Sequence, residues 1–510
     1  MTWTPNMPYM AESKKIVWEV APYLKGRGLD VGAGEFKILP HATSVDDFSH
    51  SKFGFTNRPD ILSDASDLSM FADKSMDFVY SSHTLEHVVD YRATLREWFR
   101  VLRPGGNLAL YLPHKDFYPN IGQPGANPDH KHDFLPEDII TAMPDGFDLI
   151  DKQDRNDGDE YSMLLIFVKL STKQRLFSHL KKKPEKTACV VRYGAFGDLM
   201  QASSVFAGLK RQGYHVTLFS SNPGAEVVKY DPNIDKIVLF DRDQVPNANL
   251  VNFWDWQEKK FTKWVNLSES VEGTLLAMPG RTLHYMSHAA RHRVMNINYS
   301  EFQHIVAEVP HKLEVKFFPT QDEIRWAEGE RRKIKSKKVV VWSLAGSSVH
   351  KTWAGLDNIL ASIMLNCPDT SVVLMGGPEC VILEGGWENE SRVIKACGKW
   401  SIRQSLTFAQ RADLVIGPET GVLNAVASEH MPKIVFLSHS TVENLTRDWI
   451  NTKSLFSKKT SCYPCHMLHF GFDHCKRHEE SGTAQCQVDI SIEEVWDAVE
   501  SALSYERELA

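Results

Sequence analysis

Two stretches of the sequence place a reactive side chain soon after a run of apolar residues. In the first, a glycine-punctuated loop follows the run and presents the carboxylate of Asp198 at the start of a predicted helix. In the second, the apolar residues 339–342 are followed by the small residues Gly346 and Ser347 and by the cation of Lys351. A carboxylate can take the proton of a sugar hydroxyl, and a lysine can neutralise a departing diphosphate. The pair fits transfer of a sugar from a nucleotide diphosphate, although Asp198 could instead be a helix N-cap and Lys351 an ordinary exposed lysine.

From residue 187 to the C-terminus, these motifs resemble the heptosyltransferase family, which uses ADP-heptose and has two Rossmann-like halves. The resemblance implies that Asp198 is the base that activates the acceptor and that Lys351 meets the diphosphate. The run from Asp413 to Asn424 is similar to the family's nucleotide-binding strand, loop and helix, except that Glu419 replaces an Asp and Asn424 a His. The residues implied to bind the donor are Gly346, Ser347, Lys351, Gly376, Gly377, Glu419, Thr420, Gly421 and Val422.

A second glycine loop lies in the N-terminal third, after a predicted amphipathic helix over residues 14–25. Gly32 and Gly34 would let the backbone approach a ligand closely, because a Cβ there would clash. Either Asp46 or Asp47, at the end of the next predicted strand, is placed to bind ribose hydroxyls.

Over about residues 10–170 this ordered set resembles the class I S-adenosylmethionine-dependent methyltransferases. The resemblance implies that Asp30, Gly32 and Gly34 line the methionine moiety. Asp64 and Ala65 would flank the adenine, and Asp46 or Asp47 would take the ribose. Phe36 stands where the family has its third glycine.

Histidines in the N-terminal third offer a base for methyl transfer. His130 lies in a loop region where an acceptor would sit, and it could act as general base for O-methylation. The alternative is that His130 and His132 only brace this loop, since methyl transfer often needs no more than positioning. His83 and His87, beside Glu86, are expected to pack under the cofactor.

Four cysteines, Cys462, Cys465, Cys475 and Cys486, gather near the C-terminus. Four thiolates in a short segment suit tetrahedral zinc or iron, and a nearby histidine could replace one ligand. A C-terminal cysteine finger that holds iron is known among the autotransporter-heptosylating members of the resembled family, whose acceptor is protein. The alternatives are four reduced thiols, or a redox pair of Cys462 and Cys465.

Composition limits the class of protein. The 510 residues predict about three domains. The 42% hydrophobic and 24% charged residues are typical of folded globular chains. A net charge of −7 argues against a polyanion-binding surface. We expect a cytoplasmic protein without a membrane span, because no leader-like or long apolar segment is seen.

We therefore expect an α/β chain. A Rossmann-like methyltransferase domain would span residues 1–170, and a polar linker residues 171–186. Two Rossmann-like domains of a GT-B glycosyltransferase would follow over residues 187–320 and 321–510, with a cysteine metal finger at 462–486.

The expected function is a bifunctional, sugar-modifying enzyme that uses a nucleotide-sugar donor, a glycan or protein acceptor and S-adenosylmethionine. One alternative makes the N-terminal domain a non-catalytic docking module. Another is a nucleic-acid-base glycosyltransferase, but the basic and aromatic surface stripes that it needs are not concentrated in the sequence. The oligomeric state stays open, with a homo-oligomer among the expectations.

Overall fold

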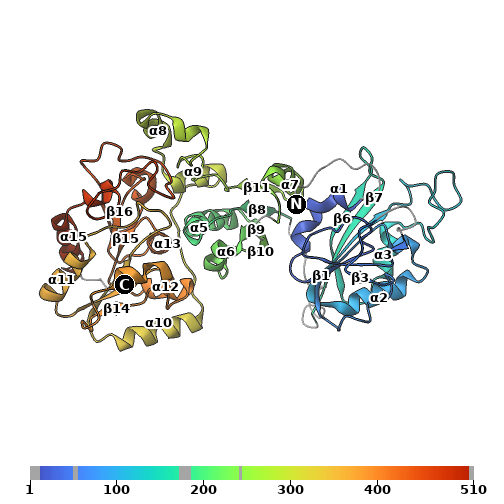
Figure 1. Cartoon of the computed structure of the whole chain (residues 1–510), viewed down its shortest axis with the longest axis horizontal. Helices are drawn as coiled ribbons and strands as arrows, with labels where there is room; N and C mark the ends of the chain where they lie inside the picture. Colours follow the sequence, from blue (N-terminus) through green and yellow to red (C-terminus); the bar gives the residue numbers. More distant parts are fainter. Residues whose placement is uncertain (1–11, 50–55, 172–184, 241–243, 505–510) are drawn as a thin grey trace. The chain divides into compact units, whose positions relative to one another are not determined.

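The computed structural model describes residues 12–49, 56–171, 185–240 and 244–504 (Figure 1). The described chain divides into two compact units, which are treated separately below. The first contains residues 12–171 together with 244–257, and the second contains residues 185–240 and 258–504. The linker predicted at 171–186 lies almost entirely outside the described residues.

The first unit is built on a seven-stranded sheet with the order β3-β2-β1-β4-β5-β7-β6, in which only β7 runs against its neighbours. The chain order reverses between β1 and β4, which is where doubly wound sheets bind ligands. The strands are β1 (Gly28–Val31), β2 (Thr43–Asp46), β3 (Ile61–Leu62), β4 (Met76–Ser82), β5 (Leu102–Pro113), β6 (Phe147–Arg155) and β7 (Ser162–Lys169).

Helices cover both faces of this sheet because successive strand residues point to opposite sides. The core on one face contains Leu108 with Leu95 and Trp98 of α2, and the core on the other contains Ala109 with residues of α1. The helices are α1 (Ser13–Val20), α2 (Tyr91–Val101), α3 (Pro136–Ala142) and α7 (Leu250–Glu258), with single turns at Ala21–Tyr23, Leu85–His87 and Asn247–Asn249. Helix α1 is shorter than predicted, since Pro22 follows it in a tighter turn.

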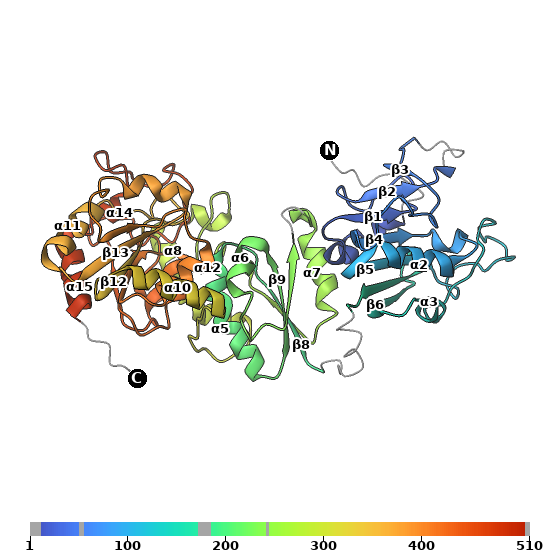
Figure 2. The same ribbon diagram turned by 90° about the horizontal axis from the view of Figure 1, so that it is seen from below.

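The second unit begins with a four-stranded parallel sheet, β10-β9-β8-β11, seen in green in Figure 2. The strands are β8 (Thr187–Val191), β9 (His215–Ser221), β10 (Lys236–Phe240) and β11 (Lys263–Asn266). The helices of this half are α5 (Phe196–Arg211), α6 (Asn222–Val228), α8 (His288–Met295) and α9 (Tyr299–Val306), with a single turn at Thr282–Tyr285.

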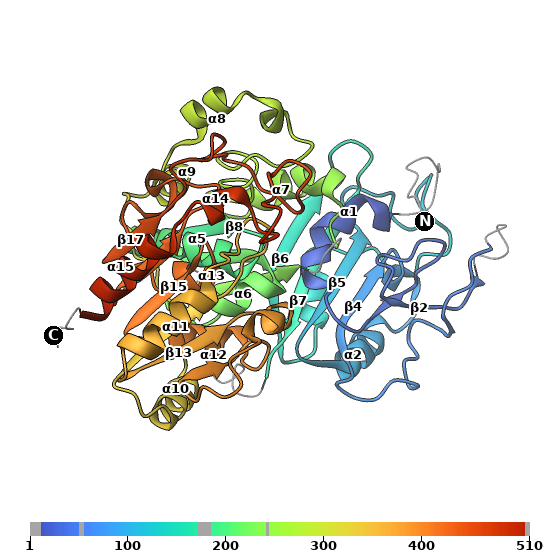
Figure 3. The same ribbon diagram turned by 60° about the vertical axis from the view of Figure 1, so that its left-hand side comes forward.

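A six-stranded parallel sheet, β14-β13-β12-β15-β16-β17, forms the other half of the second unit (Figure 3). Its strands are β12 (Lys338–Ser343), β13 (Thr370–Met375), β14 (Val393–Lys395), β15 (Leu414–Pro418), β16 (Lys433–Phe436) and β17 (Thr452–Leu455). Its helices are α10 (Gln321–Lys333), α11 (Leu356–Asn366), α12 (Ile402–Ala409), α13 (Gly421–Ala425), α14 (Gln485–Val488) and α15 (Ile492–Ser504), with turns at Pro378–Glu384 and Val442–Thr446.

The two halves of the second unit share one apolar core, which joins Val190 and Leu199 of the first half to Val341 and Leu423 of the second. The starts of α5 and α13 lie against one another, because a Cβ on Gly421 would lie only 2.1 Å from the ring of Phe196. Only glycine permits this approach between α5 and α13.

The expected mixed α/β class with parallel sheets is confirmed. None of the helices in the described ranges is both long and apolar enough to cross a membrane.

Candidate functional site

A cleft of about 730 Å³ in the second unit is lined by the carboxyl ends of strands from both of its halves. The ten residues that the sequence predicts for sugar transfer and donor binding all line this cleft: Asp198, Gly346, Ser347, Lys351, Gly376, Gly377, Glu419, Thr420, Gly421 and Val422. The carboxyl ends of parallel strands meet at one edge of a sheet, which explains why these motifs converge.

Asp198 lies in the first turn of α5, where its Oδ2 accepts a hydrogen bond from the amide of Ala195 (2.8 Å). Its Oδ1 lies 3.4 Å from a guanidinium nitrogen of the buried Arg192, and the same nitrogen donates to Glu272 Oε2 (2.8 Å). The N-cap residue is therefore Ala195 and not Asp198, which bonds back to it from the first turn and also belongs to a group of two carboxylates around one arginine. The sequence interpretation missed Arg192, which directly follows β8, and Glu272, which lies in a loop without a motif.

The two carboxylates of this group differ in acidity. Burial, followed by the charge of Glu272, raises the pKa of Asp198 to about 7. Burial would also raise the pKa of Glu272, but the charge of Arg192 and a hydrogen bond from Asp198 hold it below its ordinary value. A carboxyl group with a pKa near neutrality is suited to take a proton from an acceptor.

Lys351 is positioned by the loop that follows β12. A Cβ on Gly346 would lie 2.5 Å from Lys351 Cδ, so the lysine stem packs against a backbone that only glycine leaves open. The loop is anchored by the buried Trp353, whose indole nitrogen donates to the carbonyl of Ile490 (3.1 Å). Lys351 therefore reaches the cleft from a fixed backbone.

Glu419 lines the cleft but is strongly engaged within the protein. Its carboxylate accepts hydrogen bonds from the amide of Ser438 (2.6 Å) and the hydroxyl of Ser440 (2.9 Å), and it lies 2.8 Å from His439 Nε2. Burial would raise its pKa, but His439 and, less strongly, Lys351 hold the pKa well below its usual range. Glu419 therefore braces the loop after β16, and its contact with a donor stays a prediction.

The four C-terminal cysteines lie in one loop-rich segment, between β17 and the end of α14. Burial and the charges of the other three thiols raise the pKa of Cys465. Its carbonyl accepts a hydrogen bond from Arg291 Nε (3.0 Å), and Met467 packs with Ala277 and Met295. The cysteine segment thus contacts the first half of the unit as well as its own. Coordination by Cys462, Cys465, Cys475 and Cys486 stays a prediction.

In the first unit, the predicted cofactor loop follows β1 at the point where the strand order reverses. Gly32 and Gly34 have positive φ values of 74° and 51°. Asp46 Oδ2 accepts from the amide of Gly34 (3.0 Å), and Asp30 Oδ2 accepts from the amide of Ile38 (2.7 Å). Both acids hold the loop in shape, and burial raises the pKa of Asp30 to about 7.

The remaining predicted cofactor residues lie beside this loop. Asp47 is exposed and accepts from the amide of Ser49, and Asp64 is exposed at the end of β3. The carbonyl of Ala65 accepts from Trp98 Nε1 (2.9 Å). Phe36, in the place of the third glycine, packs against the core under α1.

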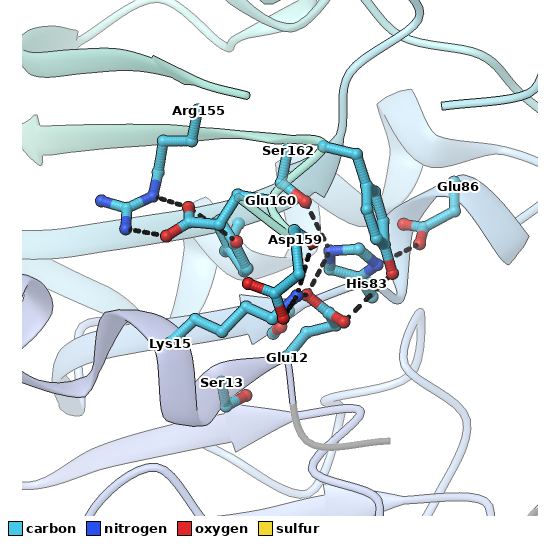
Figure 4. A network of polar contacts seen from close by, with 12 residues as sticks. Glu12, Ser13, Lys15, His83, Glu86, Arg155, Asp159, Glu160 and Ser162 are labelled. Carbon is cyan, nitrogen blue, oxygen red and sulfur yellow. Dashed lines mark hydrogen bonds and ion pairs between the residues drawn. The ribbon is translucent and has the colours of Figure 1, made fainter. Parts of the chain in front are cut away.

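His130 lies within a cluster of titratable side chains that the sequence interpretation did not foresee. Its Nε2 is 3.9 Å from Glu86 Oε1, and the nearest nitrogens of His83 and His87 lie at the same distance from this oxygen. Burial lowers the pKa of His130 to about 4, so its imidazole is neutral near pH 7. Figure 4 shows the ring of His83 between Glu86 and Ser162.

One family model matches part of the chain. Residues 29–110 match the family model described as a methyltransferase domain. A search of curated proteins found no match.

Solved structures similar to the chain include a family 9 glycosyl transferase from Veillonella parvula (17% identity, 64% of this chain, 99% of the other, TM-score 0.46). Another is the iron-containing, dodecameric glycosyltransferase TibC from enterotoxigenic E. coli (14% identity, 64% and 80% coverage, TM-score 0.43). A third is an S-adenosylmethionine-dependent methyltransferase from Aquifex aeolicus (18% identity, 31% and 90% coverage, TM-score 0.24).

Proposed function

We propose that this chain is a bifunctional sugar-modifying enzyme. The second unit is a glycosyltransferase that moves a heptose-type sugar from a nucleotide diphosphate, ADP-heptose foremost, to a glycan or protein acceptor. The first unit places a methyl group from S-adenosylmethionine on the transferred sugar or on the acceptor. The observation that carries the proposal is the cleft in which Asp198 of one half and Lys351 of the other lie together.

In the proposed sugar transfer, Asp198 accepts the proton of the acceptor hydroxyl as the hydroxyl oxygen bonds to the anomeric carbon. The bond from that carbon to the diphosphate oxygen breaks on the opposite face, so the configuration at the carbon is inverted. Lys351 stabilises the negative charge that grows on the departing diphosphate. Arg192 holds Asp198 and Glu272 near one another and does not itself move a proton.

The direct experiment is a screen of ADP-, GDP- and UDP-sugars for hydrolysis by the purified protein. Water can replace the acceptor in a transferase cleft, so a donor can be hydrolysed without its acceptor. We expect ADP-heptose to be hydrolysed fastest, because it is the donor that we propose for this cleft. Hydrolysis of none of these sugars, with the protein folded and glycan and protein acceptors also tested, would contradict the glycosyltransferase proposal.

The glycine loop of the first unit fits S-adenosylmethionine, which supplies an electrophilic methyl group when bound. The loop ends β1 at the reversal of strand order, and a Cβ on Gly34 would meet no atom within 4 Å, so the space beside it is open. Gly32 and Gly34 would hold the methionine moiety, with Asp47 available to the ribose. The alternative, a docking module, is favoured by Asp30 and Asp46, whose carboxylates already bind backbone amides.

We expect the full chain to bind S-adenosylhomocysteine in calorimetry and the Gly32→Ala variant to lose this binding. A Cβ at Gly32 would lie 2.0 Å from Thr84 Oγ1, which forces the loop to move. The full chain is needed because residues 244–257 group with the first unit. If neither S-adenosylmethionine nor S-adenosylhomocysteine at millimolar concentration gave heat of binding, the first unit would be a docking module and not a methyltransferase.

Glu272 should set the pH dependence of sugar transfer. Asp198 must be ionised to act as a base, so with a pKa of about 7 the rate should fall as the pH drops below about 7. In Glu272→Gln the neighbouring negative charge is gone while Arg192 remains, so the pKa of Asp198 should fall. The acidic limb of the pH-rate profile, where the rate drops as the pH falls, should then move to lower pH. The profile of kcat/KM against pH measures the shift.

Glu269→Gln is the matched control for this experiment, because Glu269 is an exposed carboxylate on the same loop that pairs with Arg281. Its acidic limb should match that of the unchanged protein. If the acidic limb of the profile did not shift in Glu272→Gln, the charge of Glu272 would not control the ionisation of Asp198.

We propose that Cys462, Cys465, Cys475 and Cys486 bind one zinc or iron ion. The proposal is supported by the Cys-x-x-Cys spacing and by the electrostatic influence of the other three thiols on Cys465. Cys465→Ser should lose the metal and expose the cysteine segment to protease, because binding energy at such a site is folding energy. Elemental analysis and limited proteolysis check this.

Cys367→Ser is the control, since Cys367 is a half-buried thiol outside the segment. It should keep the metal and the resistance to protease. Metal well below one ion per chain in the unchanged protein, with four freely titratable thiols, would contradict the metal site.

A further inference from the structure

The first unit contains a buried carboxylate surrounded by imidazoles. Glu86 Oε1 lies 3.9 Å from His83 Nδ1, from His87 Nε2 and from His130 Nε2. One ligand atom from each of Glu86, His87 and His130 lies within 4.8 Å of the others. Two ligands on opposite sides of one bound ion are about 4 Å apart, so a small inward movement would bring these atoms into one coordination sphere.

Glu86 is 1% exposed, and neither of its carboxylate oxygens has a hydrogen-bond partner in the described part of the chain. Burying such a group without compensation is costly, and buried polar groups are nearly always satisfied. The backbone holds the side chain in this place, because the carbonyl of Glu86 accepts from the amides of Lys131 and His132. The carboxylate is therefore buried without a hydrogen-bond partner among the described residues, and the loop that carries His130 is fixed around it.

His83 adds a fourth nitrogen with a defined orientation. Its Nε2 is 2.9 Å from the hydroxyl of Ser162, which leaves Nδ1 facing Glu86, as Figure 4 shows. A hydrogen bond on the outer nitrogen is the usual way in which a metal-binding histidine is oriented. His83 also has a positive φ of 47°, a backbone conformation that few residues other than glycine adopt.

We propose that Glu86, His87 and His130, with His83 as a fourth candidate ligand, bind a divalent transition-metal ion. Imidazole and carboxylate together suit manganese, iron, cobalt, nickel or zinc, whereas calcium and magnesium prefer oxygen ligands alone. Three protein ligands leave positions open for oxygen donors such as water or a hydroxyl group. His87 is half-exposed, so an ion could enter from solvent.

The place of the site within the sheet connects it to the predicted cofactor loop. The cluster follows β4 and the glycine loop follows β1, and these two strands are neighbours. Thr84, two residues before Glu86, donates from its hydroxyl to the carbonyl of Gly32 (3.4 Å). The metal site stands on its own geometry and does not depend on either proposed transfer reaction.

Manganese is the probe that separates this site from the cysteine segment, because thiolates select softer metals. Chelator-treated full-length protein is titrated with Mn²⁺, and binding is followed by electron paramagnetic resonance and calorimetry. We expect one Mn²⁺ per chain and at least a tenfold loss of affinity in Glu86→Gln and in His87→Gln. His132→Gln is the matched control, since His132 lies in the same loop but contacts the carbonyls of Val88 and Val89.

Circular dichroism of each variant shows whether it is folded, and His87→Gln keeps the test valid if the buried Glu86→Gln variant fails to fold. Loss of Mn²⁺ from both ligand variants and its retention in His132→Gln would support the site. Absence of Mn²⁺ binding in the unchanged protein at millimolar metal would overturn it. Equal affinity in folded His87→Gln and in the unchanged protein would overturn it as well.

Discussion

Asp198→Asn is expected to lower the rate of sugar transfer by ~10²–10⁴-fold while leaving donor affinity nearly unchanged. The carboxylate acts on the acceptor hydroxyl in the proposed mechanism, so its loss should appear in kcat more than in the dissociation constant of the donor. Transfer assays with radiolabelled donor, together with calorimetric titration of the nucleotide, separate the two effects.

The asparagine variant is informative because it preserves the structural role of the side chain. An amide oxygen can still accept the hydrogen bond from Ala195, so α5 keeps its first-turn cap. The ion pair between Arg192 and Glu272 also remains. Asp235→Asn is the matched control, because Asp235 likewise accepts from a backbone amide, that of Val216, and pairs with Lys210 near the surface of the same half.

Asp235→Asn should transfer sugar at the rate of the unchanged protein. If Asp198→Asn did so too, this carboxylate would be only a helix cap. Glu272, the other carboxylate bound to Arg192, would then be the next candidate for the base.

The cleft could be predicted from the sequence because its motifs directly follow apolar strands. Asp198, Lys351 and Glu419 follow the ends of β8, β12 and β15 by at most eight residues, and parallel strands deliver such residues to one edge. Glu272 could not be predicted, since it lies in an irregular loop whose position depends on long-range contacts. The sequence indicates Arg192 only weakly, as a single cation at the end of an apolar strand.

For the acids near the glycine loop of the first unit, the sequence did not predict the direction of the side chains. Sequence spacing identifies an acid near a glycine loop but does not tell whether its oxygens face a ligand or the backbone. Asp30 and Asp46 both bind amides of their own loop, whereas Asp47 is exposed. The direction of a side chain at a strand end depends on the local turn, which spacing does not encode.

The cluster around Glu86 was hidden for a similar reason. Its histidines come from two segments, one after β4 and one in the loop that contains His130, more than 40 residues apart. The interpretation that His83 and His87 pack under the cofactor did not place His130 beside them. Only the folded loop, bound through the carbonyl of Glu86, brings the segments together.

Residues 244–257 show the same dependence on distant contacts. The alternation of strands and helices predicted that this stretch belongs to the glycosyltransferase half. In the structure it groups with the first unit, where the guanidinium of Arg155 lies 4.5 Å from the ring centre of Trp256. The helix in this stretch, α7, was not predicted, and contacts between residues far apart in the sequence decide which unit it joins.

Lys351→Ala should weaken donor binding and slow the chemical step together, with a fall in kcat of ~10²–10³-fold, the usual effect of removing one group that stabilises transition-state charge. The reason is that the lysine meets the diphosphate charge both before and during bond breaking. Lys351→Arg should recover part of both losses, because it restores a positive charge. Donor affinity and single-turnover rates measure the two effects separately.

The alanine variant should stay folded, because Glu419 keeps its bonds to Ser438, Ser440 and His439 and the loop keeps its anchor at Trp353. Lys399→Ala is the control, since Lys399 is an exposed lysine of the same half whose ammonium donates to the carbonyl of Lys395. If Lys351→Ala bound and transferred the sugar as the Lys399 control does, the diphosphate would be neutralised by another group. Arg281, the other cation besides Arg192 that lines the cleft within the described residues, would be the residue to replace next.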